Sequence, residues 1–169
     1  MIAEGETQLG KGYVWGSIPD PSDPNPAGFD CSGFTRWLTH RYGFTNVPTG
    51  SEGQYEEAYK QGILRGGVND LDAVQPGDLV FFDTAWRGGG LCDGRSGSDP
   101  VDGCPNRASH VGIFKGYDAQ GNPIVLQAGG GSVSEVNAYQ MYDVNGNIAP
   151  ILGVASPGAY GPPSGGYYA

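Results

Sequence analysis

Cys31 lies where a run rich in glycine and proline gives way to the pattern of a helix. The first turn of a helix has unpaired backbone N–H groups and the positive end of the helix dipole, and both favour a thiolate over a thiol. The neighbouring residues Asp30, Ser32 and Gly33 are small and mostly polar, which argues against a purely apolar surrounding. A buried structural cysteine is the alternative. The position therefore indicates a candidate nucleophile.

A cysteine nucleophile needs a base, and the sequence contains two histidines. His40 follows Cys31 by nine residues on the same expected helix, so it lies roughly half a turn out of phase and about 13.5 Å further along the axis. His40 therefore cannot reach the sulfur. His110 opens an expected strand after a long loop, where it can face the start of the helix from the end of a sheet. We take His110 as the candidate base, with an ordinary half-exposed strand residue as the alternative.

A Cys–His pair usually needs a third polar group that hydrogen bonds to the ring nitrogen facing away from sulfur and so selects the useful tautomer. Gln127 ends the apolar run Ile124–Leu126 and is the one polar side chain of that expected strand. An uncharged amide carbonyl is sufficient for this task. Gln127 is therefore the candidate orienting residue, with a plain polar residue at a strand end as the alternative.

Two helices and four strands are expected to position these residues. Apolar residues at spacings of three and four predict a helix over residues 31–42. A more polar helix is expected over residues 51–61, with Ser51 as N-cap and Gln54 as its capping-box partner. Short runs rich in β-branched and aromatic residues predict strands over residues 78–82, 110–115, 123–127 and 151–154. Helices followed by strands predict an α+β fold, with the N-terminal helices packed on a central antiparallel sheet.

The composition favours one loop-rich globular domain. Of 169 residues, 31 are glycine and 13 are proline, but 38% are apolar and 11% aromatic, which argues against disorder. The formal net charge is −9 and no basic run occurs, so nucleic acid and membrane surfaces are not expected as partners. No apolar stretch approaches the ~20 residues that a membrane span needs.

We expect a domain over residues 1–156 with a loop insertion at 84–109, followed by a linker-like flexible tail at 157–169. The insertion contains Cys92 and Cys104, separated by eleven residues. A disulfide between them would stabilise the loop by about 3 kcal/mol and would indicate an oxidising setting. A metal site is the alternative because aspartates lie nearby, but the spacing matches neither a zinc knuckle nor an EF-hand, and no metal is expected.

Four motifs occur in order along the chain: Tyr13–Gly16, Phe29–Phe34, Pro76–Phe82 and Ser109–Phe114. Together they resemble the NlpC/P60 cysteine peptidases, over about residues 10–155. The resemblance implies a papain-like α+β core and an enzyme that hydrolyses amide bonds in the stem peptides of bacterial peptidoglycan. The bond that the family most often cleaves joins γ-D-glutamyl to a diamino acid. The resemblance implies no cofactor.

The resemblance also implies a role for each residue. The nucleophile would be Cys31, the base His110 and the orienting residue Gln127. The oxyanion and substrate-binding roles would fall on Tyr13, Trp15, Asp30, Ser32 and Ser109. Two of these, Tyr13 and Trp15, have plain core aromatics as their alternative.

Departures from the family pattern concern mainly specificity. Gln127 stands where many members carry a second histidine, and Gly50 stands where an arginine often occurs. Amidases that cut between N-acetylmuramic acid and L-Ala share the Cys–His core and are the nearest alternative. A catalytically silent wall-binding or tail-structural module is the alternative of another class.

The ends of the sequence suggest a context for this activity. The start at Met1 without a signal peptide, together with the linker-like tail, predicts a monomer or a module of a longer chain. We expect it to act outside the cell on the wall, delivered by a phage or carried on a virion.

Overall fold

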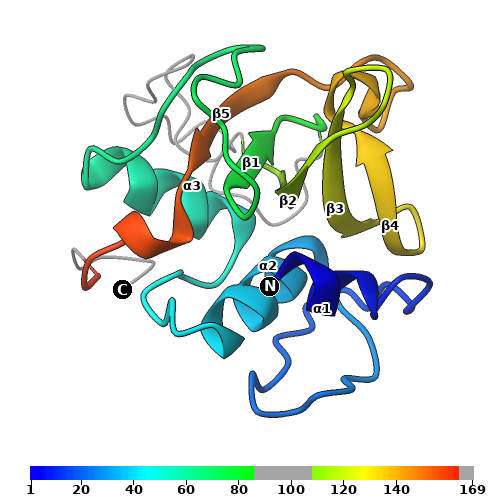
Figure 1. Cartoon of the computed structure of the whole chain (residues 1–169), viewed down its shortest axis with the longest axis vertical. Helices are drawn as coiled ribbons and strands as arrows, with labels where there is room; N and C mark the ends of the chain where they lie inside the picture. The colour runs from blue at the N-terminus through cyan, green and yellow to red at the C-terminus, as the bar shows by residue number, and fades with distance from the viewer. Residues whose placement is uncertain (86–107, 164–169) are drawn as a thin grey trace.

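The computed structural model describes residues 1–85 and 108–163. The centre of the fold is a five-stranded antiparallel sheet with the strand order β4-β3-β2-β1-β5 (Figure 1). Its strands are β1 (Leu79–Phe82), β2 (His110–Tyr117), β3 (Pro123–Gly129), β4 (Ser132–Asn137) and β5 (Ile151–Ala155). The helices are α1 (Ile2–Glu6), α2 (Cys31–Arg41) and α3 (Ser51–Lys60), with short 3-10 turns η1 (Ala138–Gln140) and η2 (Pro157–Ala159). The predicted α+β class is confirmed, and each predicted helix and strand is present with slightly shifted ends.

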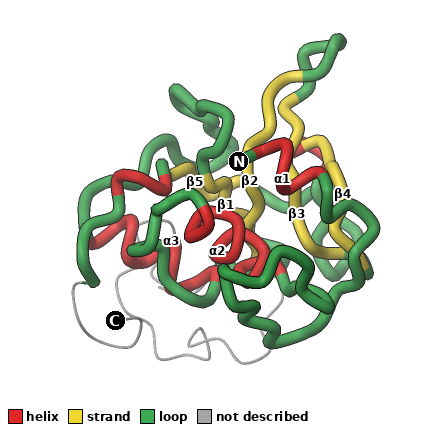
Figure 2. The backbone as a smooth tube through the Cα atoms, turned by 60° about the horizontal axis from the view of Figure 1, so that its bottom comes forward, coloured by secondary structure: helices red, strands yellow, loops and turns green. Residues whose placement is uncertain are grey.

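The two faces of the sheet bury different sets of side chains, because side chains alternate along each strand. One face packs against α2 and α3, and its buried side chains include Leu79, Phe81, Val111, Ile113 and Leu126. The other face packs against the segments around residues 71–74 and 138–149, and its buried side chains include Val80, Phe82, Phe114, Val125 and Val154. Figures 1 and 2 show α2 and α3 on the same side of the sheet. Helices therefore cover one face and loops the other.

The start of α3 differs from the prediction. The N-cap is Gly50, with φ +78° and no side-chain cap, so the predicted cap Ser51 is wrong and Ser51 is already helical. Gln54, the predicted capping-box partner, is fully buried. Its Nε2 donates to the Pro48 carbonyl at 3.0 Å, and its Oε1 accepts from Thr35 of α2 at 3.0 Å. A buried amide must satisfy its polar atoms, so packing against α2 outweighs the capping preference.

Sequence reasoning missed the edge strand β4 and the short helix α1. A tight turn at Gly130 and Gly131, with φ of +61° and +99°, joins β3 to β4. Two glycines between extended runs are a hairpin signal. The signal was hard to recognise because only Val133 of β4 is buried, so the strand lacks the usual apolar alternation.

The prediction of a flexible tail over residues 157–169 is wrong for its first part. Tyr160 is buried, and its hydroxyl donates to the Gln54 carbonyl at 2.6 Å. The Gly161 N–H donates to Gln61 Oε1 at 2.7 Å. These contacts attach the segment to α3, because a buried tyrosine contributes both apolar area and a satisfied hydroxyl. The predicted disulfide residues Cys92 and Cys104 lie outside the described residues.

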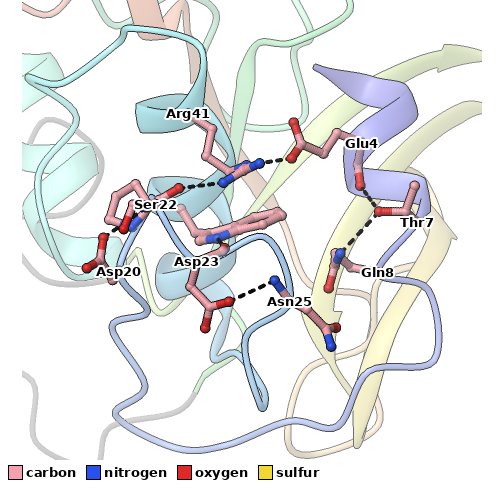
Figure 3. A network of polar contacts seen from close by, with 10 residues as sticks. Glu4, Thr7, Gln8, Asp20, Ser22, Asp23, Asn25 and Arg41 are labelled. Atoms are coloured by element: carbon pink, nitrogen blue, oxygen red, sulfur yellow. Dashed lines mark hydrogen bonds and ion pairs between the residues drawn. The ribbon is translucent and has the colours of Figure 1, made fainter.

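The proline-rich loop over residues 19–26 is held against α2. The Trp37 indole N–H donates to the Asp23 carbonyl at 2.9 Å, and Arg41 donates to the Pro21 carbonyl at 2.6 Å. Arg41 also pairs with Glu4 of α1 (Figure 3) and lies 5.1 Å from the centre of the Trp37 ring. The loop that leads to Cys31 therefore has a defined position.

Candidate active site

A pocket of about 600 Å³ lies where the start of α2 meets the start of β2 and the end of β3. Every described residue with a predicted site role lines this pocket: Tyr13, Trp15, Asp30, Cys31, Ser32, Ser109, His110 and Gln127. These residues come from segments separated by up to about a hundred positions in the sequence. The fold therefore brings the whole described set together.

Cys31 is the first residue of α2 and is 8% exposed. Asp30 caps the helix, since its carboxylate accepts from the Gly33 N–H at 2.6 Å. The same carboxylate accepts from the Gly16 N–H at 3.1 Å, which ties the preceding loop to the helix start. Gly33 permits the close approach of the loop at Ser17 to the helix start, because a Cβ at residue 33 would lie 2.1 Å from the Ser17 carbonyl oxygen. The local sequence thus builds the helix start that carries the thiol.

The expectation that the helix start favours a thiolate is wrong for this structure. Burial raises the pKa of the Cys31 thiol to about 12, and the negative charge of Asp30 adds to the rise. Hydrogen bonds from the backbone N–H groups of Val111 and Ser32 lower the pKa but do not compensate. Desolvation of a buried charge costs more than the partial charge of a helix end supplies. Cys31 is therefore a neutral thiol near pH 7.

His110 is the first residue of β2 and is also 8% exposed. Burial lowers the pKa of its imidazole to about 4, although a hydrogen bond with Gln127 acts in the opposite direction. Its Nε2 has no hydrogen-bond partner in the part of the chain that the structure describes. The ring is therefore neutral near pH 7, and one of its nitrogens is available for a group in the pocket.

Gln127 holds the other side of this ring. Its Nε2 donates to the Ser134 hydroxyl on β4 at 2.8 Å, so its Oε1 is left to accept from the imidazole. We assign this bond to Nδ1–H, because Nε2 has no hydrogen-bond partner among the described residues. Gly129 leaves room for the arrangement, since a Cβ there would lie 2.6 Å from Gln127 Oε1 and 3.2 Å from His110 Cε1. Sequence reasoning missed both Ser134 and Gly129, although the run of three glycines after Gln127 was visible.

The other predicted residues occupy distinct positions around the pocket. Tyr13 is half-buried, and burial together with the nearby Cys31 and Asp30 raises the pKa of its hydroxyl to about 12. Trp15 is 68% exposed at the rim, which excludes the core alternative for this residue. The Ser109 hydroxyl is occupied, since it accepts from the Thr84 N–H at 2.9 Å.

Glu52 also lines the pocket, and sequence reasoning missed it. Burial raises the pKa of its carboxyl group, and the charge of Asp30 adds to the rise. The described residues that line the pocket include no lysine or arginine. The only signal in the sequence was that Glu52 lies two positions after Gly50, and Gly50 is the position at which the family pattern often has an arginine.

The described residues provide neither a metal-binding cluster nor a membrane-spanning helix. No group of three or more His, Cys, Asp or Glu side chains among them could hold a metal ion. None of the described helices is long and apolar enough to cross a membrane.

The NlpC/P60 family model matches residues 10–92, a stretch that includes Cys31 and ends before His110. A probable endopeptidase p60 of Listeria seeligeri is 42% identical over 83 residues, which are 49% of this chain and 13% of that protein. A probable endopeptidase p60 of Listeria innocua is 34% identical over 116 residues, which are 69% of this chain and 17% of that protein. The chain thus spans less than a fifth of the length of these curated relatives.

Solved structures share the fold. NlpC1 and NlpC2 from Trichomonas vaginalis both superpose with a TM-score of 0.50, at 20% and 22% sequence identity. They cover 91% and 90% of this chain, which in turn covers 41% and 43% of theirs.

The fold and the pocket define an α+β protein with a cysteine at a helix start and a histidine at a strand start. The sequence match and the structural likeness agree with this class, and the chain belongs to the NlpC/P60 family.

Proposed function

We propose that the chain is a peptidoglycan hydrolase that cleaves an amide bond in the stem peptide by a cysteine–histidine mechanism. The observation that carries the proposal is one pocket that holds both Cys31 and His110, in which Gln127 orients the imidazole and leaves Nε2 unpaired. The names of the Listeria relatives, probable endopeptidases, support hydrolysis of a peptide bond. The bond that we propose joins γ-D-glutamyl to a diamino acid.

In the proposed first step, Cys31 Sγ attacks the carbonyl carbon of the amide while its proton moves to His110 Nε2. Both groups are neutral at rest, so the proton moves during the attack and not before it. The negative charge then falls on the carbonyl oxygen. The Cys31 backbone N–H and the Tyr13 hydroxyl would stabilise it, and the raised pKa of Tyr13 keeps that hydroxyl protonated as a donor.

In the second step, His110 donates its proton to the leaving amine as the C–N bond breaks, and an acyl-thioenzyme remains. A water molecule then attacks the thioester carbon while His110 accepts its proton. The C–S bond breaks, and the proton returns to the sulfur. Gln127 acts in both halves because it fixes the ring through Nδ1 and keeps Nε2 on the reacting side.

The remaining residues at the pocket would bind the peptide. Asp30, Ser32 and Ser109 lie beside the proposed catalytic pair, and Trp15 offers an exposed aromatic face at the rim. No cofactor takes part in this mechanism. We propose that the chain acts outside the cell on the wall, as a monomer or a module of a longer polypeptide such as a phage-delivered lysin.

Digestion of purified sacculi by the wild type and by Cys31→Ala, with product masses measured, tests the proposal. We expect the wild type to release peptides cut after the glutamyl residue, and a folded Cys31→Ala to release none. Lactyl-muramic ends with an intact stem peptide would assign the amidase activity instead. Equal digestion by the variant would refute the thiol mechanism. Sedimentation of the wild type with sacculi without any product would indicate a wall-binding module.

A further inference from the structure

We infer that the hairpin over residues 141–149 binds the part of the stem peptide that continues beyond the diamino acid, and that Tyr142 sets this preference. The inference rests on the proposed function and deepens it, since it names the stems that the pocket favours. Three residues of the hairpin line the pocket, namely Met141, Tyr142 and Val144. None of them belongs to the four motifs that relate the chain to its family.

Hydrogen bonds within the hairpin hold its turn in a defined shape. The Asp143 N–H donates to the Asn147 carbonyl at 2.7 Å. The Asp143 carboxylate accepts from the N–H groups of Asn145 and Asn147 at 2.8 and 2.9 Å. Tyr142 and Ile148 are paired directly opposite each other, so their side chains lie on the same face. The turn therefore presents a tyrosine and an isoleucine side by side.

The hairpin is attached to the side of the pocket that carries the base. The Val144 N–H donates to the Thr84 carbonyl at 2.9 Å, and the Thr84 N–H donates to the Ser109 hydroxyl at 2.9 Å. Ser109 immediately precedes His110. In the proposed mechanism His110 donates its proton to the leaving amine, which belongs to the diamino acid. The peptide that continues from this diamino acid therefore passes beside His110 toward the hairpin.

The hairpin offers apolar surface at the rim of the pocket. Tyr142 is 63% exposed and Val144 is 61% exposed, and Ile148 is exposed as well. Contiguous apolar side chains that remain exposed beside a pocket mark a binding surface, whereas scattered ones do not. In a stem tetrapeptide the residue after the diamino acid is D-alanine. Its methyl group can cover part of this surface and remove it from water.

The charges of the pocket favour the same stems. In a stem tripeptide the diamino acid ends in a carboxylate next to the bond to be cleaved. The described lining residues include Asp30 and Glu52 but no lysine or arginine, so this carboxylate would be repelled. A further residue replaces the carboxylate by an amide and moves the charge up to ~3.6 Å away. Contact and charge both favour the longer stem, and peptides with an amidated carboxyl terminus separate the two effects.

Three synthetic peptides, all amidated at the carboxyl terminus, test the inference: L-Ala-γ-D-Glu-L-Lys, the same peptide extended by glycine, and the same peptide extended by D-alanine. All three carry the same leaving amine next to an amide, so their intrinsic reactivity is matched. We expect wild-type kcat/KM to be about fivefold higher for the D-alanine peptide than for the tripeptide, since a fully buried methyl group contributes a factor of about four. The glycine peptide should lie between them.

Variants of the hairpin assign the effect to Tyr142. In Tyr142→Ala the ratio of kcat/KM between the D-alanine peptide and the tripeptide should approach one. Tyr142→Phe should keep the wild-type ratio, because the contact is apolar. The matched control is Tyr139→Ala, since Tyr139 is also exposed and lies three residues earlier but does not line the pocket. This control should keep the wild-type ratio, and its loss there would overturn the assignment to Tyr142.

The outcomes separate the inference from the proposed function. Equal wild-type rates on the three peptides, with Cys31→Ala inactive, would overturn the inference and leave the function intact. An unchanged ratio in Tyr142→Ala would also overturn it. If the wild type cleaves none of the peptides, the function fails for them, and calorimetric binding to Cys31→Ala decides the inference. Tighter binding of the D-alanine peptide that disappears in Cys31→Ala/Tyr142→Ala would support it, and equal or absent binding would overturn it.

Discussion

The buried His110 links the stability of the fold to pH. Burial lowers the pKa of its imidazole from 6.5 to about 4. Above pH 6.5 the group is neutral in both the folded and the unfolded chain and contributes no pH dependence. Between pH 6.5 and about pH 4 the unfolded chain binds a proton that the folded chain does not. The free energy of unfolding must therefore fall as the pH falls through this window.

The size of the effect follows from the shift in pKa. A depression of roughly 2.5 units, at about 1.4 kcal/mol per unit, gives a limit of about 3.5 kcal/mol, most of which is lost by about pH 4.5. His110 is 8% exposed, so solvent screening reduces this value little. Replacement by glutamine removes the titrating group. We therefore expect the wild type to lose about 2.5 kcal/mol more than His110→Gln between about pH 8 and pH 4.5.

Urea unfolding of both proteins at the two pH values measures this difference. Carboxyl groups and His40 titrate in the same range, but they are common to both proteins and cancel in the comparison. An overall loss of stability in His110→Gln does not affect the test, because only the pH dependence is compared. Equal pH dependence in the two proteins would refute the reasoning that burial keeps the imidazole neutral.

Three further predictions follow from the same structure. Gly129→Ala places a methyl group against Gln127 Oε1 and should lower kcat/KM on wall peptides about 10- to 100-fold. Gly67→Ala is the control and should leave kcat/KM unchanged, because a Cβ there meets nothing within 4 Å. Equal rates for the two variants would contradict the orienting role of Gln127. Tyr160→Phe removes the hydroxyl that donates to the Gln54 carbonyl of α3 and should cost about 1 kcal/mol in urea unfolding, and no loss would mean that this hydrogen bond does not stabilise the fold. The pH–rate profile of the wild type should stay level down to about pH 5 and fall near pH 4, since His110 must be neutral to accept a proton; a fall centred at pH 6.5 would contradict the buried environment.

Much of the fold was predictable from local patterns. The helix at Cys31–Arg41 and the four core strands were recognised because their apolar residues follow the period of the element and glycine or proline marks the ends. The cap of α3, the strand β4 and the attachment of Tyr160 were not recognised. The packing of Gln54 and the attachment of Tyr160 depend on partners that are distant in the sequence, namely Thr35 for Gln54 and the Gln54 carbonyl for the tyrosine hydroxyl. The strand β4 pairs with its neighbour β3 but lacks the apolar alternation that reveals a strand.

The candidate site likewise contains residues that local sequence could identify and residues that it could not. Residue type and order were sufficient to select Cys31, His110 and Gln127, because the chain offers few residues with the chemistry required. Ser134 and Gly129 escaped attention, since their role is to hold or make room for Gln127 and has no chemistry of its own. Glu52 escaped attention because an acidic residue in the first turn of a helix is ordinary.

The sequence by itself determined which residues could react and where the helix that presents the thiol begins, because Asp30 and Gly33 act within one turn of Cys31. Only the tertiary structure decided the protonation states of the pair, since these depend on how much protein excludes water from the sulfur and the imidazole. It also decided that Gln127 holds the imidazole from β3 and that Glu52 enters the pocket from α3. Contacts of this kind depend on strand register and helix packing across the whole chain, which no local pattern encodes.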